Sequence, residues 1–191
     1  MDSGQHAERP RSGFLSTLLK LVGLVALVIV LSSALRAFVF QAYEIPSGSM
    51  EETIMTGDMV FSEKVSYYFR DVEPGDIVTF NDPLSPGRVL IKRVIAVGGQ
   101  VVDINNDDGL VYVDGEPLQE PYTDGLPSYR LDNSIANVTY PYRVPEGELW
   151  VMGDNRTNSQ DSRYFGSIDQ DTVMGRGALI YWPLDHFGLL E

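Results

Sequence analysis

The sequence predicts a mainly β protein, in which an antiparallel β domain with a loop-rich insertion follows one N-terminal transmembrane helix. One observation is a single long apolar run near the N-terminus. Another is that the rest of the chain consists of short strand-like runs separated by Gly, Pro and Asp. Outside the apolar run no stretch has an amphipathic helical pattern, so antiparallel hairpins should dominate. The 191 residues suffice for one domain with a real core, but not for two large ones.

The apolar run covers residues 14–40, and its charge-free centre at 21–35 would form a helix about 22 Å long. Crossing a bilayer takes about 20 residues, and the flanking apolar residues supply them if Lys20 extends toward the interface. We interpret this run as a retained membrane anchor. A cleaved signal peptide and a buried core helix are the alternatives.

The chain therefore divides into a tail at 1–13, an anchor at 14–40 and a β-rich domain at 41–191. Arg9 and Arg11 favour a cytoplasmic N-terminus, although Arg36 argues weakly for the opposite orientation. Expected strands lie at 58–64, 76–81, 89–97, 101–104, 110–113, 148–152 and 174–181, and residues 115–145 form the loop-rich insertion.

Charge and residue absences exclude several functions. The formal net charge is −13, and residues 41–191 alone carry −15, which argues against nucleic acid as a partner. Without cysteine there is no disulfide, thiolate nucleophile or Cys-ligated metal. The only histidines are His6 and His186, so a histidine-rich metal site is excluded and a Ser-His-Asp triad could use only His186. We expect neither a metal nor a cofactor.

Directly after the anchor, residues 45–50 read Ile-Pro-Ser-Gly-Ser-Met. Two hydroxyls flank a glycine behind a proline, a pattern typical of a stiff turn with exposed side chains. A simple linker turn explains the same composition, and composition alone favours it.

A second pattern places Lys92 within the apolar run 90–97. In a strand, Leu90, Lys92 and Val94 share one face. Lys92 either extends to solvent at a strand end, as strand lysines usually do, or is buried among apolar neighbours. Burial would lower the pKa of the lysine and make its amine available as a base.

The third pattern is the polar run 153–163, which begins Gly-Asp-Asn-Arg directly after an apolar strand. It is either a solvated turn with a surface ion pair or a network in which Asp161 pairs with Arg163. In the network interpretation, the Ser159 hydroxyl hydrogen-bonds an amine and orients its lone pair.

In this order along the chain, the anchor, the serine turn, the lysine strand and the Gly-Asp-Asn run resemble the bacterial type I signal peptidases. These are membrane-anchored serine–lysine endopeptidases, and the resemblance covers about residues 14–191. It implies that Ser49 is the nucleophile and Lys92 the general base. Ser47 matches the side-chain donor of the oxyanion hole, with the Ser49 N–H as the second donor.

The resemblance also assigns supporting roles. Ser159 matches the hydroxyl that orients the lysine amine, while Asp161 and Arg163 match a supporting ion pair with Asp154 nearby. The family removes signal peptides from secreted preproteins after a small-x-small site, typically Ala-x-Ala. The implied partners are preproteins and the lipid bilayer of the bacterial cytoplasmic membrane, with the catalytic domain extracytoplasmic. Residues matching the family's shallow apolar pockets are Tyr43, Ile45, Met50, Ile54, Leu90 and Ile91.

Two departures from the family pattern affect turns. Glu52 stands where the serine motif usually continues with proline, and residues 96–100 replace the usual Gly-x-Pro-Gly-Asp. Two rival functions stay open. One is a membrane-anchored, non-catalytic β domain that binds a ligand; the other is an autocleaving, repressor-type serine–lysine protease. A sortase-like transpeptidase is excluded by the missing cysteine.

Overall fold

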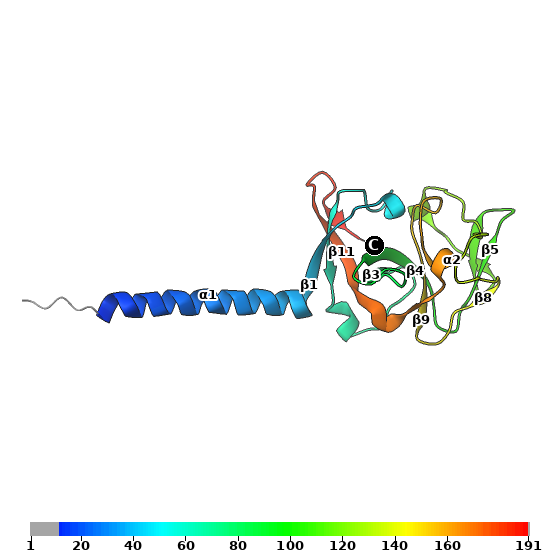
Figure 1. The fold of residues 1–191 in the computed structure, drawn as a ribbon. Helices are drawn as coiled ribbons and strands as arrows, with labels where there is room; N and C mark the ends of the chain where they lie inside the picture. The colour runs from blue at the N-terminus through cyan, green and yellow to red at the C-terminus, as the bar shows by residue number, and fades with distance from the viewer. Residues whose placement is uncertain (1–11, 191) are drawn as a thin grey trace, which may run out of the picture. The chain divides into compact units, whose positions relative to one another are not determined.

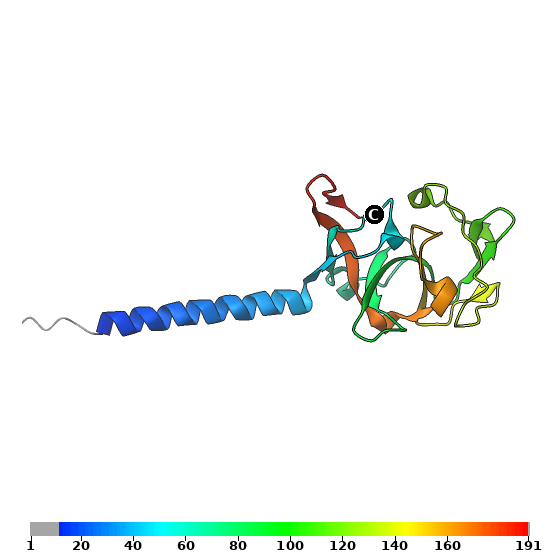
Figure 2. The same cartoon turned by 45° about the horizontal axis from the view of Figure 1, so that its top comes forward.

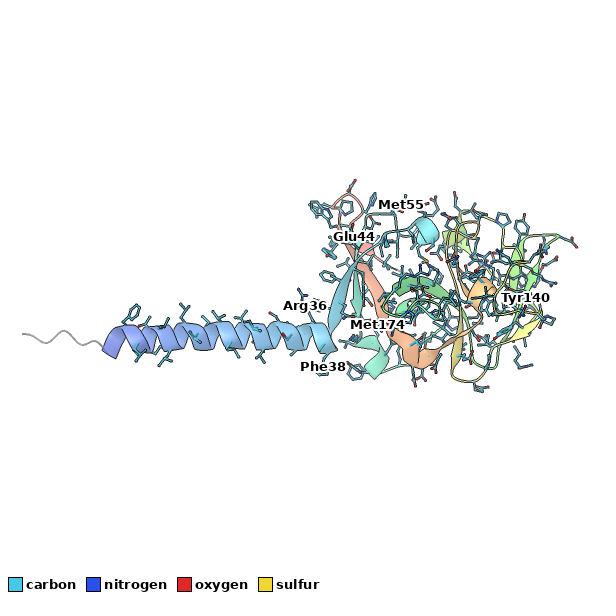
Figure 3. All side chains as sticks on the ribbon, viewed as in Figure 1. Arg36, Phe38, Glu44, Met55, Tyr140 and Met174 are labelled. Carbon is cyan, nitrogen blue, oxygen red and sulfur yellow. The ribbon has the colours of Figure 1, made fainter. Side chains whose placement is uncertain are left out.

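The computed structural model describes residues 12–190, in which helix α1 and a β domain form two compact units divided after Phe38. Helix α1 spans Ser12–Phe38, and from Gly13 onward its mean hydropathy reaches 2.6. No side chain from residue 13 to 38 is buried, and Figure 3 shows side chains projecting from all sides of the helix. This exposure does not fit a buried core helix, whereas the length and composition suffice to cross a membrane.

The boundaries of α1 differ slightly from the predicted segments. The predicted tail at 1–13 lies outside the described residues except for positions 12 and 13, which belong to α1. The predicted anchor at 14–40 overlaps α1 up to Phe38, and Phe40 begins the first strand.

The β domain is built on an eight-stranded antiparallel sheet, which confirms the predicted fold class. The order is β1-β2-β11-β3-β4-β9-β10, with β12 paired to β11. Its strands are β1 (Phe40–Glu44), β2 (Met59–Glu63), β3 (Ile77–Asn81), β4 (Val89–Val97), β9 (Glu148–Met152), β10 (Ile168–Asp169), β11 (Val173–Trp182) and β12 (Gly188–Leu189).

A second, four-stranded antiparallel sheet has the order β7-β6-β5-β8. It lies at the end of the domain away from β1 and β11, with β4 and β9 between (Figures 1 and 2). The predicted insertion at 115–145 contributes only two short strands and the 3₁₀ helix η3 (Pro121–Thr123) and otherwise consists of turns and loops. The strands of this sheet are β5 (Val101–Asn105), β6 (Leu110–Val113), β7 (Glu116–Pro117) and β8 (Tyr142–Arg143).

Helical structure in the rest of the described chain is short. The α-helix α2 (Ser162–Phe165) is a single turn that Asp161 caps by accepting a hydrogen bond from the Arg163 N–H. The remaining 3₁₀ helices are η1 (Gly48–Met50), η2 (Ser66–Tyr68) and η4 (Gln170–Thr172).

β4 packs against apolar clusters on both of its faces. Ile95 packs into a cluster around Trp150 that joins the two sheets, and Val94 packs into a different cluster of the larger sheet. A strand that packs on both sides must be apolar almost throughout, which explains the nearly continuous apolar run. Lys92 and Arg93 lie in the middle of this strand and are each only 2% exposed.

The segment after β1 packs into a third apolar cluster. Met50 and Ile54 are completely buried, and burial of such side chains stabilises a fold by about 1.5–3 kcal/mol each. The cluster therefore fixes the position of the serine turn relative to β4. It consists of Ile45, Met50, Ile54, Val60, Ile77, Ile91, Ile180 and Leu190.

The departure at residues 96–100 forms a tight connection between β4 and β5. Gly99 has φ +88°, which favours glycine. A Cβ on Gly98 would lie 2.9 Å from the Glu146 Cα, so this position has no room for a side chain. The Gln100 side chain accepts a hydrogen bond from the Val97 N–H at 3.0 Å and closes the turn.

Candidate active site

Ser49 and Lys92 meet below the surface although 43 residues separate them in sequence. Ser49 lies in η1, which follows β1, and Lys92 lies in β4. Ser49 Oγ and Lys92 Nζ are 2.7 Å apart and hydrogen-bonded. The amine also donates to the Ile91 carbonyl oxygen at 2.8 Å. Within residues 12–190 the amine forms no ion pair with a carboxylate.

Burial sets the protonation state of the lysine. Desolvation lowers the pKa of Lys92 from 10.5 to about 8, because the charged ammonium loses its water shell. Asp161 and Asp154 act in the opposite direction through their negative charge, and the Arg88 cation lowers the pKa further. Near pH 8 the amine is therefore neutral in about half of the molecules and able to accept a proton.

Ser47 and Ser159 both lie beside this pair and line one cavity with it. Ser47 is exposed and lines the cavity beside Ser49. The Ser159 hydroxyl is buried and makes no hydrogen bond of good geometry within the described chain. A Cβ on Gly153 would lie 2.3 Å from both Ser159 Oγ and the Ser49 carbonyl oxygen, so only glycine leaves room for both. The second hydrogen bond of the Lys92 amine goes to the Ile91 carbonyl and not to Ser159.

Asp161 and Arg163 form a fully buried ion pair. Arg163 Nε and Nη2 donate to the two carboxylate oxygens at 2.9 and 2.8 Å, and the Gly153 N–H donates to Oδ2 at 3.1 Å. Burial alone would raise the pKa of Asp161, but the Arg163 guanidinium and these hydrogen bonds hold it below its usual value. Asp161 is therefore a charged group that fixes the loop after β9.

Asp154 forms a second buried pair, with Arg93. Arg93 Nε and Nη2 donate to the carboxylate at 2.9 and 2.8 Å, and Thr53 Oγ1 donates to Oδ2 at 2.5 Å. The Arg93 guanidinium also stacks on the Tyr122 ring, 4.0 Å from its centroid. Asp154 therefore connects β4 to the segment that follows Ser49.

An apolar groove runs along the dyad between two strand edges. β4 pairs with β9 only from Arg93 onward, so the edge of residues 89–92 on that side lacks a strand partner within the described chain. β1 is the first strand of the sheet, and its outer edge is likewise unpaired there. Four of the predicted pocket residues line the groove: Tyr43, Ile45, Leu90 and Ile91.

Met50 and Ile54, which the resemblance also assigned to these pockets, lie elsewhere. Both are 0% exposed and belong to the apolar cluster under the serine turn. Neither lines the groove, so the prediction that they contact substrate is corrected. They support the turn from below, because η1 directs Ser49 toward Lys92 and the following apolar side chains toward the core.

Comparisons with known proteins identify the family of this chain. The family described as "Signal peptidase, peptidase S26" matches residues 18–182. The chain belongs to this family. It is 40% identical over 176 residues to a probable signal peptidase I-1 of Synechocystis, covering 88% of this chain and 85% of that one. It is 34% identical to signal peptidase I of Mycobacterium tuberculosis, covering 96% and 79%. A crystal structure of an Enterococcus faecalis signal peptidase I is 30% identical, with a TM-score of 0.46, and covers 56% of this chain and 97% of that one.

The departure at Glu52 changes the backbone relative to the usual S26 motif. Glu52 has φ +80°, which costs a residue other than glycine about 1–2 kcal/mol. Proline, whose φ is fixed near −65°, cannot adopt this conformation. The turn after the serine therefore has a different course here from one built on Pro-Thr, while Ser49 and Lys92 still meet.

Three residues whose hydrogen bonds hold the segments of this candidate site together were not predicted from the sequence. Arg93 and Thr53 hold Asp154, and Asn155 contacts the serine turn from the loop after β9. A signal for Arg93 was available, because a second cation beside Lys92 in an apolar strand needs a buried carboxylate. The contacts of Thr53 and Asn155 depend on segments about 100 residues apart, which no local pattern indicates.

Proposed function

We propose that Ser49 attacks the scissile carbonyl and that Lys92 takes the serine proton as general base. The activity itself follows from family membership: the chain is a serine endopeptidase that removes signal peptides from preproteins. The observation that carries the assignment is the 2.7 Å contact between a buried hydroxyl and a buried amine that has no ion-pair partner among the described residues.

The reaction follows from the protonation state of the amine. Ser49 Oγ forms a bond to the carbonyl carbon while its proton moves to neutral Lys92, and the carbonyl π electrons move to the oxygen. The Ser49 N–H and the Ser47 hydroxyl would stabilise that oxyanion. The oxyanion then collapses and the C–N bond breaks, while the Lys92 ammonium protonates the leaving amine. In the second half, Lys92 takes a proton from a water whose oxygen bonds to the acyl carbon; the C–Oγ bond then breaks and Lys92 returns the proton to Ser49 Oγ.

Substrate binding follows from the unpaired edges. We infer that the signal peptide binds extended in the groove and hydrogen-bonds the main chain of 89–91 and of the segment after β1. Tyr43, Ile45, Leu90 and Ile91 leave shallow apolar space, which suits side chains of methyl size. This supports cleavage after a small-x-small site.

We further infer that α1 crosses the bacterial cytoplasmic membrane with the N-terminus cytoplasmic and the β domain outside. The predominantly apolar helix supports the anchor, and Arg9 and Arg11 support the orientation. The −15 charge of residues 41–191 argues against nucleic acid as a partner. Family membership supports preproteins as partners, and the apolar helix supports lipid.

The test is cleavage of a labelled preprotein by the full chain in detergent, with the cut position read by mass spectrometry. We expect one cut after a small-x-small sequence and none with Ser49→Ala. An exposed-serine control, Ser85→Ala, should cleave like the parent. Cleavage by Ser49→Ala would overturn the assignment of the nucleophile. Preprotein binding without any cleavage by the parent would favour the non-catalytic binding domain.

A further inference from the structure

Asn155 lies against the peptide backbone of the serine turn. Its Nδ2 donates to the Gly48 carbonyl oxygen at 3.0 Å, and its backbone N–H donates to the Ser49 carbonyl oxygen at 3.2 Å. The loop after β9 thus holds the residue before the proposed nucleophile and the nucleophile itself. Neither contact reaches Ser49 Oγ or Lys92 Nζ, so Asn155 has no part in the proton transfer.

The orientation of the Asn155 amide is determined by its neighbours. The Nδ2 group faces two groups that can only accept, the Gly48 carbonyl and the Glu51 carboxylate, the latter at 3.3 Å. On the other side the Thr157 hydroxyl donates to Asn155 Oδ1 at 3.3 Å. A flipped amide would place its oxygen against both acceptors, so only the observed orientation satisfies all partners.

The Gly48 carbonyl matters because it shares a peptide unit with the Ser49 N–H. In a planar trans peptide the C=O and the N–H point in opposite directions. A hydrogen bond that fixes the Gly48 carbonyl therefore fixes the direction of the Ser49 N–H. Donation to the carbonyl also polarises the unit and strengthens the N–H as a donor. The Glu51 N–H donates to the same oxygen at 3.2 Å, so Asn155 adds a second constraint from outside the turn.

We propose that Asn155 is a positioning residue for the oxyanion hole, which acts through the Gly48–Ser49 peptide and stabilises the transition state of peptide cleavage. The inference rests on the proposed function, in which the Ser49 N–H is an oxyanion donor. The neighbouring Asp154 supports this role because its pair with Arg93 ties the same loop to β4. The loop thereby aligns the oxyanion donor with the strand that carries the base.

The first test compares steady-state cleavage of a fluorogenic signal peptide by Asn155→Ala, Asn155→Asp and the parent. Complete loss of one oxyanion donor typically costs about 10²–10³-fold. Misorientation of a donor that remains in place should cost less, about 10- to 100-fold in kcat with little change in KM. Asn155→Asp should cost more than Asn155→Ala, because a carboxylate would face the Gly48 carbonyl and Glu51.

Two controls distinguish a positioning role of Asn155 from a nonspecific effect of the substitution on the domain. Asn133→Ala removes an exposed amide elsewhere in the domain and should cleave like the parent. The midpoint of the pH–rate profile should be the same in Asn155→Ala and the parent, since the environment of Lys92 is unchanged. A shifted midpoint would show that Asn155 acts on the base and would overturn the proposal.

The deciding experiment measures the affinity of a signal peptide that ends in an aldehyde against the matched peptide alcohol. Ser49 Oγ adds reversibly to the aldehyde, its proton moves to Lys92, and the resulting oxyanion occupies the hole; the alcohol cannot react. We expect Asn155→Ala to weaken aldehyde binding by the same factor as kcat/KM and to leave alcohol binding unchanged. Equal losses for both ligands, or no loss for either, would overturn the proposal. If the parent itself binds both ligands equally, the proposed function fails, and the inference with it.

Discussion

Lys92 and Arg93 are neighbours on β4, both 2% exposed, yet their surroundings differ completely. Arg93 faces a carboxylate through two hydrogen bonds and stacks on an aromatic ring. Lys92 faces a hydroxyl and a carbonyl oxygen. Successive side chains of a strand point to opposite faces of the sheet, so Lys92 and Arg93 lie in two different environments.

The difference suits one strand to hold both a structural cation and, in the proposed mechanism, a base. A guanidinium stays charged in any protein environment and must be neutralised when it is buried. An ammonium buried without a carboxylate can instead lose its proton, which makes it useful as a base. Substitutions at the two sites should therefore have opposite effects on stability. Removal of the Arg93 partner should lower the free energy of unfolding, whereas replacement of Lys92 should raise it at neutral pH.

The largest effect is expected when the base is replaced. Lys92→Met and Lys92→Arg should each lower kcat/KM at least about 10⁴-fold, because neither side chain can accept the serine proton near neutral pH. The measurement is signal-peptide cleavage, with circular dichroism to verify the fold. Retention by Lys92→Arg of more than about 1% of the parent activity would contradict the role of Lys92 as base.

Removal of the Arg93 partner should affect stability. Asp154→Ala removes a carboxylate that neutralises the buried Arg93 guanidinium and should lower the free energy of unfolding by about 3–5 kcal/mol in urea denaturation. The matched control is Asp103→Ala, whose pair with Arg130 is exposed and should contribute about 0–1 kcal/mol. Equal losses in the two variants would show that burial of the Asp154 pair has no special effect.

Burial of Lys92 should also destabilise the native protein at neutral pH. The unfolded chain keeps the Lys92 proton up to about pH 10.5, whereas the native state releases it near pH 8, so stability rises as the pH increases between these values. Lys92→Met lacks this dependence and should unfold with a free energy about 3 kcal/mol higher at pH 7. Urea denaturation at pH 7 and above pH 10.5 tests this, since the parent and the variant should converge at the higher pH.

The smallest expected effect is a shift in the pKa of Lys92. The kcat/KM of the parent should rise with pH through a midpoint of about 8, because the neutral amine is the reactive form. Arg88→Gln removes a cation that lowers the pKa of Lys92, so the midpoint should move upward. Arg143→Gln, an exposed change on β8, should leave it in place. A downward shift with Arg88→Gln would contradict the electrostatic explanation.

Local patterns predicted most of the fold. All seven expected strands occur within one or two residues of their bounds, because apolar alternation and Gly or Pro turns are local signals. β1 was missed because Phe40 continues the apolar run of the helix. The two-residue strands such as β10 and β12 are defined by pairing with distant partners and not by their own composition.

For the site, the sequence predicted which chemical groups are present better than it predicted where their side chains lie. The groups Ser49, Lys92, Asp161 and Arg163 were expected, and the structure brings Ser49 to Lys92 and Asp161 to Arg163. Their assigned roles remain predictions. Residue type alone could not distinguish Ile45, which lines the groove, from Ile54, which lies in the core. That distinction depends on how η1 turns, which is a property of the folded chain.

The incomplete pairing of β4 has a consequence for selectivity. Main-chain donors and acceptors are common to every polypeptide. A groove formed by unpaired strand edges can therefore hydrogen-bond a peptide whatever most of its side chains are. We propose that discrimination depends on the few apolar side chains that line the groove beside Ser49, which leave no room for large side chains. On this proposal, one enzyme accepts signal peptides that differ in most of their sequence.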